Sequence, residues 1–307
     1  MGVFIREKML SMWKKNERDD AERKAKQSPT PGVDRLRDLA YIDDGHKMHQ
    51  LDIFYPENTQ GLLPTIFDVH GGGWMYGDKE LNEYFCMSLS AMGFTVVDIS
   101  YRLIPEVQLK EQVSDVFAAL QWIGENGKNY HCDLEKFFIT GDSAGGHLSS
   151  LVTAINTNDE ALHLYGFERL PFEIKGICIN HGIGDLHNTM IGSKAVQNES
   201  ERFWFGKRPK NNPIYYKSSL VEIADASTYP PALILTSKPD ELFRNSVQIM
   251  DFFDAGGFKY ERYIPDENAP GAQRLGHVFN VLYPEWEESR AANHAMTDFF
   301  KRQLIGE

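Results

Sequence analysis

The chain is poor in cysteine and has no long apolar run. Its 307 residues include three cysteines, Cys86, Cys132 and Cys178, which are odd in number and far apart. This pattern excludes a disulfide framework and a cysteine metal motif, and it is typical of buried thiols in a reducing compartment. No stretch of about 18 apolar residues is present, so we expect no membrane-spanning helix. The first residues lack the apolar segment of a signal peptide, so we expect a cytoplasmic protein.

Clusters of positive charge are also absent. Asp and Glu number 44 against 32 Lys and Arg, which gives a formal net charge of −12. Because nucleic-acid binding depends on grouped basic side chains, this balance argues against nucleic acid as a partner. The length suits a single α/β domain that carries an insertion.

Short apolar segments alternate with helical segments along most of the chain. Residues 39–44 and 49–56 predict an antiparallel strand pair that turns at Asp44-Gly45. Further strands are predicted at 64–70, 94–101, 136–146 (running into a glycine turn), 174–183, 230–237 and 259–265. Helices are predicted at 79–92, 112–127, 147–156, 241–255 and 285–303. This alternation predicts an α/β fold with a mostly parallel, twisted sheet flanked by helices.

Two segments do not follow the alternation. Residues 1–38 form a predicted helical arm, in which a helical stretch at 4–26 is stopped by the Pro- and Gly-containing segment 28–32. Its apolar side chains follow one helical stripe: Phe4, Ile5, Met9, Met12 and Trp13. The arm is either a surface helix or a lid element that belongs to a cap, and the sequence leaves both open. Residues 185–224 are polar, aromatic and irregular, and we expect them to be a cap inserted into a catalytic domain of residues 39–307.

The strongest chemical signal is the segment Gly141-Asp142-Ser143-Ala144-Gly145. It fits the G-x-S-x-G pattern and lies between a predicted strand and a predicted helix, which is the context that a nucleophile elbow requires. Small residues are needed around Ser143 because the turn is tight. The alternative is a glycine turn that only connects strand to helix.

A second glycine-rich segment, His70-Gly71-Gly72-Gly73-Trp74, follows a predicted strand. Acyl transfer passes through an oxyanion that backbone amides must bind, and glycines let the backbone approach closely. We expect the amides of Gly71, Gly72 and Ala144 to be the oxyanion donors. A phosphate-binding loop is the alternative, but no pattern of that kind follows.

A serine nucleophile needs a base and an acid that orients it. Asp240 follows the predicted strand 230–237 and is the predicted acid, with Glu241 and Asp225 as competitors.

The predicted base is His277, in a loop before the final helix. His294 lies within that helix, where we expect a structural histidine, and His187 precedes the acid, so it is out of the expected chain order. His70 is expected to be structural.

Aromatic residues near the oxyanion segment and in the predicted cap are candidates for the substrate pocket. They are Trp74, Phe203, Trp204, Phe205, Tyr215 and Tyr216. Packing inside the cap is an equal alternative for each of them.

Several motifs in combination resemble the hormone-sensitive-lipase-like branch of the α/β-hydrolases. They are HGGGW, SYRLIPE (100–106), GDSAGG, PALILTSKPDEL and GHVF, and they extend from about residue 48 to the C-terminus. The resemblance implies a carboxylesterase with Ser143 as nucleophile, Asp240 as acid, His277 as base, and no cofactor or metal. The chain departs from the family pattern in SYRLIPE, at Lys238-Pro239 and in a lengthened segment at 266–275. We expect that segment to border the substrate pocket.

The expected reaction is hydrolysis of small, short-chain carboxylic esters through an acyl-enzyme. Alternatives are removal of acetyl or feruloyl groups from carbohydrates, aryl formamide hydrolysis, and a homologue that binds ligands without turnover. An edge strand at 259–265 could also pair with a second copy of the chain, which gives a homodimer as a testable hypothesis.

Overall fold

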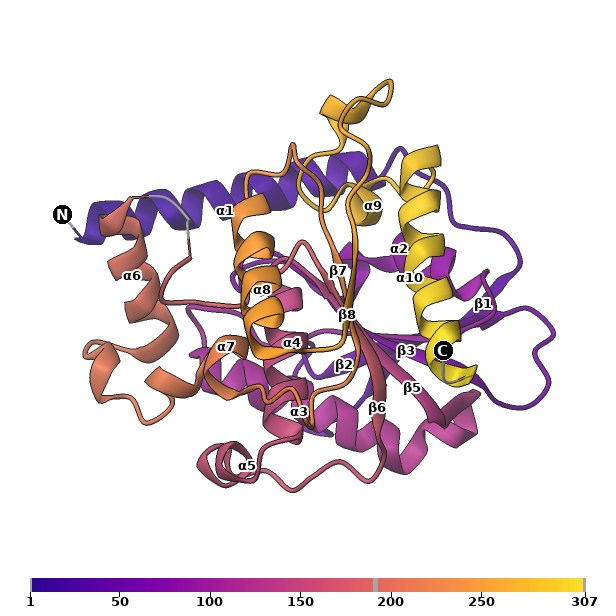
Figure 1. Ribbon diagram of the computed structural model, residues 1–307, viewed down its shortest axis with the longest axis horizontal. Helices are drawn as coiled ribbons and strands as arrows, with labels where there is room; N and C mark the ends of the chain where they lie inside the picture. The colour runs from indigo at the N-terminus through magenta and orange to yellow at the C-terminus, as the bar shows by residue number, and fades with distance from the viewer. Residues whose placement is uncertain (1, 190–192, 306–307) are drawn as a thin grey trace.

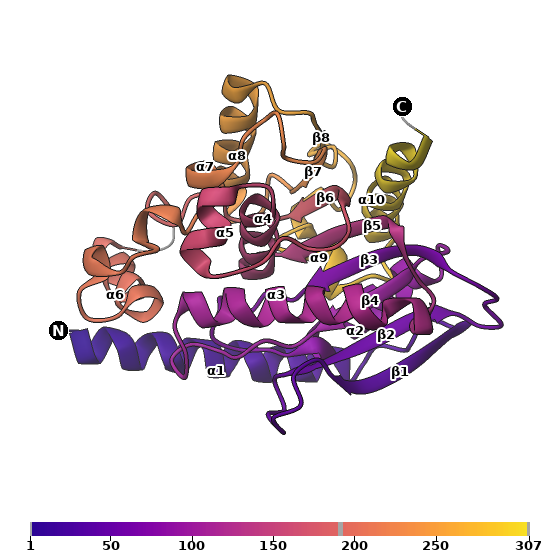
Figure 2. The same cartoon turned by 90° about the horizontal axis from the view of Figure 1, so that it is seen from below.

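An eight-stranded sheet runs through the middle of the protein (Figures 1 and 2). The computed structural model describes residues 2–189 and 193–305, with the side chains of Val3 and Phe4 outside the described part. The sheet order is β1-β2-β4-β3-β5-β6-β7-β8. The strands are β1 (Val33–Ala40), β2 (Gln50–Pro56), β3 (Leu63–Val69), β4 (Thr95–Ile99), β5 (Cys132–Asp142), β6 (Ile174–Asn180), β7 (Ala232–Leu235) and β8 (Tyr260–Tyr263).

Pairing in the sheet is antiparallel from β1 to β2 and from β2 to β4, and parallel between all later neighbours. The central strands are buried on both faces, which is why they read as continuous apolar runs. Parallel strands bring their carboxyl ends to one edge, and the loops that follow β3, β5, β6 and β7 meet there. The predicted α/β fold with a mostly parallel sheet is confirmed.

Helices cover both faces of the sheet. One apolar cluster joins α3, α4, α5 and α8 to one face, and a second joins α2, α9 and α10 to the other. The helices are α1 (Gly2–Lys24), α2 (Glu83–Ser90), α3 (Leu109–Asn126), α4 (Ala144–Asn156), α5 (Asp159–Tyr165), α6 (Lys194–Phe205), α7 (Leu220–Ile223), α8 (Phe243–Gly256), α9 (Phe279–Leu282) and α10 (Glu287–Ile305). Each helix of the described part of the chain is too short or too polar to cross a lipid bilayer.

The first hairpin differs from its prediction. The antiparallel pair forms, but β1 ends at Ala40 and residues 41–49 make a broad connection in place of a tight turn at Asp44-Gly45. Tyr41 is buried there, and its hydroxyl donates to the carbonyls of Met48 and Ser100. β1 lies at the sheet edge with an irregular pattern of burial, so its side chains do not alternate as a strand signal requires.

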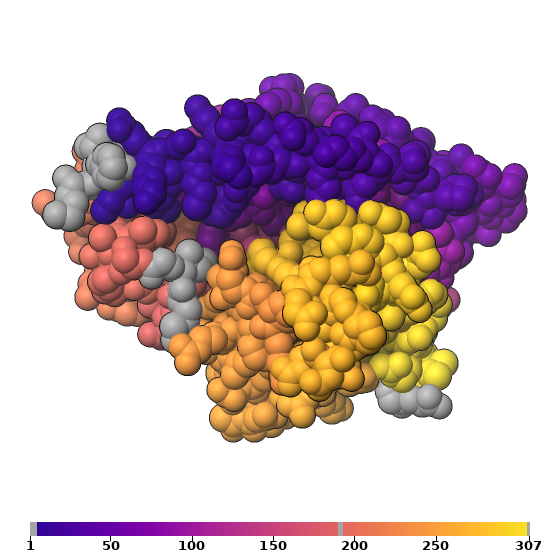
Figure 3. All heavy atoms as spheres, turned by 90° about the horizontal axis from the view of Figure 1, so that it is seen from above, coloured from indigo at the N-terminus to yellow at the C-terminus, as the bar shows by residue number. Residues whose placement is uncertain are grey.

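The N-terminal helix α1 is docked along the sheet edge where the loops after β3, β5 and β7 meet. Figure 3 shows it, in indigo, stretched beside α6 and the yellow C-terminal region. Near its end, Arg23 donates to the carbonyl of Leu282 at 2.6 Å, and Lys24 forms an ion pair with Glu83 at 2.6 Å. The arm is therefore held against the sheet-containing part of the chain by partly buried polar contacts.

Candidate active site

Ser143 lies at a sharp turn between β5 and α4. Its backbone has φ 54° and ψ −114°, a region that residues with a side chain rarely adopt. A Cβ added at Gly145 would lie 1.8 Å from the carbonyl oxygen of Val69, so only glycine fits beside the turn. The Ser143 amide donates to the carbonyl of Asn180 at 3.0 Å. These contacts hold the serine at the N-terminus of α4, where the helix dipole favours negative charge.

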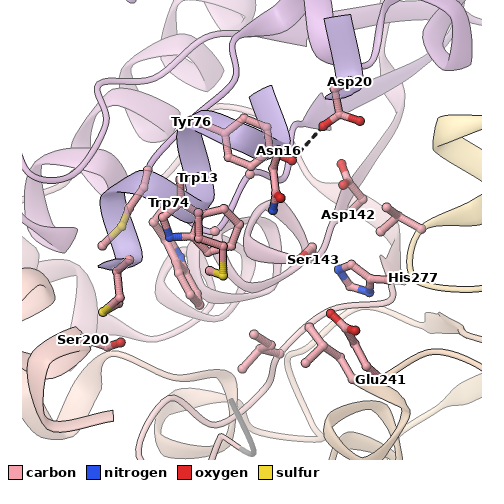
Figure 4. Close-up of a pocket in the computed structure, with 18 of the residues that line it drawn as sticks. Trp13, Asn16, Asp20, Trp74, Tyr76, Asp142, Ser143, Ser200, Glu241 and His277 are labelled. Carbon is pink, nitrogen blue, oxygen red and sulfur yellow. Dashed lines mark hydrogen bonds between the residues drawn. The ribbon is translucent and has the colours of Figure 1, made fainter. Parts of the chain in front are cut away.

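Asp240 and His277 come together from two different loops. Asp240 follows β7, and its Oδ1 lies 3.0 Å from Nδ1 of His277. The Asp240 side chain is fully buried, whereas that of His277 is 25% exposed. Figure 4 shows His277 next to Ser143, and both line the same cavity. The structure thus brings together the three residues that the sequence predicts as the triad.

The carboxylate and the imidazole change one another's proton affinity. Burial alone would raise the pKa of Asp240, but hydrogen bonds from His181 and His277 outweigh it and hold that pKa well below its usual value. Burial alone would lower the pKa of His277. The hydrogen bond to Asp240 and the charges of Asp240, Asp142 and Glu241 outweigh it, so this pKa lies above the ordinary histidine value.

The oxyanion segment requires one correction. The amide of Gly71 donates to Oδ1 of Asp142 at 3.0 Å, so it is already engaged and Gly71 does not line the cavity. Gly72 (φ 94°) and Gly73 (φ 57°) both line it. Gly73, which the prediction passed over, thus lines the cavity and Gly71 does not. The sequence could not show this, because it does not reveal that the side chain of Asp142 caps the first amide.

His181 is a site residue that the sequence analysis missed. Its Nδ1 lies 2.6 Å from Oδ2 of Asp240, and its side chain is fully buried. It follows β6 directly, at the same sheet edge as the other site residues. The signal in the sequence is its position directly after a buried strand, but chain order relative to the acid does not point to it.

A buried polar line runs beneath the oxyanion segment. Asn82 donates at 2.8 Å to both Asp142 and Asp68, and Asp68 pairs across the sheet with Asp98. Burial raises the pKa of Asp142, and burial together with the charge of Asp142 raises the pKa of Asp68 to about 8. Asp68 is therefore mostly protonated at neutral pH, and Asn82 links the strand before the glycines to the turn before the nucleophile.

Two clusters of side chains have donor atoms close enough together to be weighed as metal sites among the described residues. The hydrogen bonds from His181 and His277 to Asp240 account for the geometry of the first. The second consists of Asp68, Cys86 and Asp98, where burial raises the pKa of both carboxyls and of the thiol. Burial thus favours the protonated, weakly ligating forms of the second cluster, whereas the donor atoms of the first cluster are engaged with one another.

A cavity of about 710 Å³ opens above Ser143. Figure 4 shows Trp13 and Trp74 on one side of the serine and His277 on the other. Its apolar lining is Ile5, Met9, Met12, Trp13, Trp74, Met75, Leu81, Ile183, Val196, Trp204, Leu242, Val278, Val281 and Leu282. Helix α1 therefore forms part of the cavity wall, which favours the lid interpretation of the arm over a plain surface helix.

The predicted pocket aromatics divide into two groups. Trp74 and Trp204 line the cavity, and their rings meet edge to face with centroids 5.0 Å apart. Phe203, Phe205, Tyr215 and Tyr216 do not line it, so their assignment to the pocket is corrected. Phe205 and Tyr215 pack on each other with centroids 5.0 Å apart, and Phe203 lies under Arg6 of α1. Phe203, Phe205 and Tyr215 are buried packing residues, whereas Tyr216 is exposed. Phe203 and Phe205 miss the cavity because a helix turns neighbouring side chains to different faces.

Comparison with known proteins gives one family match and several relatives. The BD-FAE family profile matches residues 51–250. Esterase LipQ of Mycobacterium tuberculosis (strain ATCC 25618 / H37Rv) is 30% identical over 208 residues, which are 67% of this chain and 49% of LipQ. The probable carboxylic ester hydrolase LipM of the same strain is 30% identical over 210 residues, 67% of this chain and 48% of LipM. The chain thus spans about half the length of the curated relatives it matches.

Solved structures match over nearly the whole chain. Esterase B from Lactobacillus rhamnosis (HN001) has a TM-score of 0.91 at 27% identity, covering 98% of this chain and 96% of Esterase B. A truncated carbohydrate esterase from gut microbiota has a TM-score of 0.71 at 22% identity, covering 90% of this chain and 99% of the other. The second likeness is one of fold alone.

Proposed function

Because the chain belongs to the BD-FAE family, a hormone-sensitive-lipase-like esterase family, we propose that it is a serine carboxylesterase acting on small, short-chain esters. The observation that carries this proposal is the hydrogen bond at 3.0 Å between Asp240 and His277, beside a serine in a strained elbow at the same cavity. A base oriented by a buried carboxylate next to an exposed hydroxyl is the arrangement that activates serine.

The proposed reaction has two acyl-transfer steps. His277 accepts the Ser143 proton as Oγ attacks the ester carbonyl carbon, and the resulting oxyanion is held by the amides of Gly72, Gly73 and Ala144. The intermediate collapses, the bond to the alcohol breaks, and His277 gives its proton to the leaving oxygen. Water, deprotonated by His277, then attacks the acyl-enzyme, and the carboxylic acid leaves as Ser143 recovers its proton.

The substrate side of the proposal rests on the cavity walls. We assign the cap to two segments, the arm that precedes strand β1 and the insertion 185–224, because α1 and α6 both contribute apolar side chains to the lining. The arm ends before Val33, since the predicted boundary at residue 38 falls inside β1. The tryptophan side of the cavity would take the acyl chain. Esterase B, the 27% identical structure, has been solved as a C4-C4 tributyrin phosphonate complex, which supports a short acyl chain for this protein as well.

The direct test is a fluorophosphonate probe combined with a substrate panel. The wild type should be labelled and should hydrolyse p-nitrophenyl acetate and butyrate faster than the decanoate. Ser143→Ala should lose labelling and lower kcat by roughly 10⁴-fold or more. Ser150→Ala, a buried serine on the same helix α4, is the matched control and should keep both. Labelling that persists in Ser143→Ala would rule out this nucleophile.

The same panel separates the alternatives. Acetylated xylan and a feruloyl ester test a carbohydrate-ester role, and N-formylkynurenine tests formamide hydrolysis. We expect each to react more slowly than p-nitrophenyl butyrate, because the cavity is lined mainly by aliphatic and aromatic side chains. Tight binding of a small acid without any turnover would instead indicate a ligand-binding homologue.

The homodimer remains a prediction. Strand β8 forms one outer edge of the sheet, and an edge strand leaves backbone groups that a second copy can pair with. Light scattering at several concentrations tests it, and a mass of one chain throughout would reject it.

A further inference from the structure

On the basis of the proposed function, we propose that His181 is a positioning residue for the catalytic acid. It holds the Asp240 carboxylate through one oxygen, so that the other oxygen is fixed in place for His277. Nothing in the family pattern or in the predicted triad assigns this histidine a role.

The two histidines occupy different oxygens of one carboxylate. Nδ1 of His181 lies 2.6 Å from Oδ2 of Asp240, and Nδ1 of His277 lies 3.0 Å from Oδ1. The amide of Leu242 also donates to Oδ1 at 2.7 Å. The imidazole rings are perpendicular, with centroids 5.7 Å apart. A carboxylate held at both oxygens cannot rotate about its Cβ–Cγ bond without losing a hydrogen bond.

The protonation state of His181 follows from its surroundings. Its side chain is fully buried, and burial lowers its pKa, so the ring is neutral at neutral pH. Nε2 has no partner among the described residues, whereas Nδ1 faces a carboxylate. The proton therefore resides on Nδ1, and His181 donates a hydrogen bond without adding a charge.

The backbone places His181 for this contact at a conformational cost. Its φ is 52°, and its amide donates to the carbonyl of Leu235, the last residue of β7, at 2.7 Å. The preceding residue, Asn180, accepts the amide of Ser143. The end of β6 thus contacts the nucleophile turn on one side and the acid loop on the other. Strained residues that are held by several such contacts occur mainly at functional sites.

Loss of the donor should be felt at His277. Without His181, the Asp240 carboxylate is less stabilised and attracts the imidazole proton more strongly, so the pKa of His277 rises. The charged or titratable groups that face His277 are Asp240, Asp142, Glu241 and His181, and only the last is changed in the test. The acidic limb of the kcat/KM profile should therefore move to higher pH.

The experiment compares a donor-free variant with one that retains a donor. His181→Leu removes the hydrogen bond, and His181→Ala is a second donor-free variant in case the first does not fold. His181→Asn can place an amide N–H near the position of Nδ1, and asparagine tolerates a positive φ. Each is assayed with p-nitrophenyl acetate across pH, and the His277 imidazole is titrated by NMR, which needs no turnover.

We expect kcat of the donor-free variants to fall by roughly tenfold to a hundredfold, the range typical of hydrogen-bond partners one layer from the reacting groups. KM should stay within about threefold, the His277 pKa should rise, and His181→Asn should recover most of the rate. Unchanged kcat and His277 pKa in the donor-free variants would overturn the proposal. The proposal would also be overturned if kcat fell equally in all three variants and the fall paralleled a fall in their unfolding temperatures. If the wild type hydrolyses no ester, the proposed function fails, and the NMR titration still decides the role of His181.

Discussion

The indole of Trp13 lies against Gly73 so closely that a Cβ added to the glycine would be 2.3 Å from two ring carbons. Trp13 also stacks on Tyr76, with ring centroids 5.5 Å apart, and Tyr76 donates to Asp20 at 2.9 Å. A residue from the first turns of the chain therefore packs directly on the glycine segment proposed to hold the oxyanion. This contact makes α1 a part of the wall of the proposed active site.

A double-mutant cycle on Trp13 and Gly73 tests this coupling. Gly73→Ala should lower kcat/KM by at least tenfold, because the new methyl group meets the indole and a positive φ disfavours alanine by roughly 1–2 kcal/mol. In a Trp13→Ala background, Gly73→Ala should lower kcat/KM by less. The clash with the indole is then absent, and only the backbone strain at positive φ remains. Steady-state kinetics of the four proteins measure the coupling, and strictly additive losses would contradict the contact.

The width of the apolar part of the cavity should set the acyl-chain preference. Met9→Trp adds volume to a side chain of α1 that lines the cavity, so it should lower kcat/KM for p-nitrophenyl octanoate more than for the acetate. We expect the octanoate-to-acetate ratio to fall by roughly tenfold, since a misfit of one or more methylenes is worth ~1–3 kcal/mol. Lys14→Ala, an exposed residue of the same helix outside the lining, is the control. Equal ratios in wild type and Met9→Trp would show that α1 does not limit the acyl chain.

The pH dependence of kcat/KM should reflect the raised pKa of His277. The base must be neutral to accept the Ser143 proton, so activity should fall as pH is lowered through a value above the ordinary histidine pKa. The charge of Glu241 contributes to the raised pKa of His277. Glu241→Gln should therefore move the acidic limb of the kcat/KM profile to lower pH by about a few tenths of a unit. Because Glu241 is exposed, added salt should reduce the shift. Glu261→Gln, on strand β8, is the control and should leave the acidic limb of the kcat/KM profile unchanged. If Glu261→Gln moved that limb as far as Glu241→Gln does, the shift would be a general charge effect.

Asp68 should make stability decline as pH rises. Its pKa is about 8 in the folded protein, mainly because of burial and the charge of Asp142, against about 3.9 in an unfolded chain. The folded state holds the proton more tightly, so this stabilising contribution is complete below about pH 4 and is lost as pH rises through 8. Asp68→Asn removes the titration, and its unfolding midpoint should change less between pH 6 and pH 9 than that of the wild type. Asp159 is an exposed carboxyl, so Asp159→Asn should show the same pH dependence of the unfolding midpoint as the wild type. If Asp68→Asn also showed the wild-type pH dependence, Asp68 would not be the group responsible.

Much of the fold was readable because the signals are local. Apolar strands that alternate with helices specify a parallel sheet, and the small residues around Ser143 specify a tight turn whatever surrounds it. The strand β1 was misplaced because an edge strand with irregular burial carries no period-two pattern. Asp240 and His277 were found from chain order, which the fold class supplies.

What the sequence determined by itself is the class of chemistry, since the glycine turns and the order of serine, acid and histidine are properties of short segments. What only the tertiary structure decided is which atoms meet across the sheet edge. The Asp142 carboxylate accepts a hydrogen bond from the Gly71 amide, and the His181 ring, at the end of a neighbouring strand, hydrogen-bonds Asp240. Trp13 of α1 packs on Gly73. Each of these contacts joins residues that are tens of positions apart, and no local propensity or spacing encodes such a distance. Packing of the whole chain fixes them.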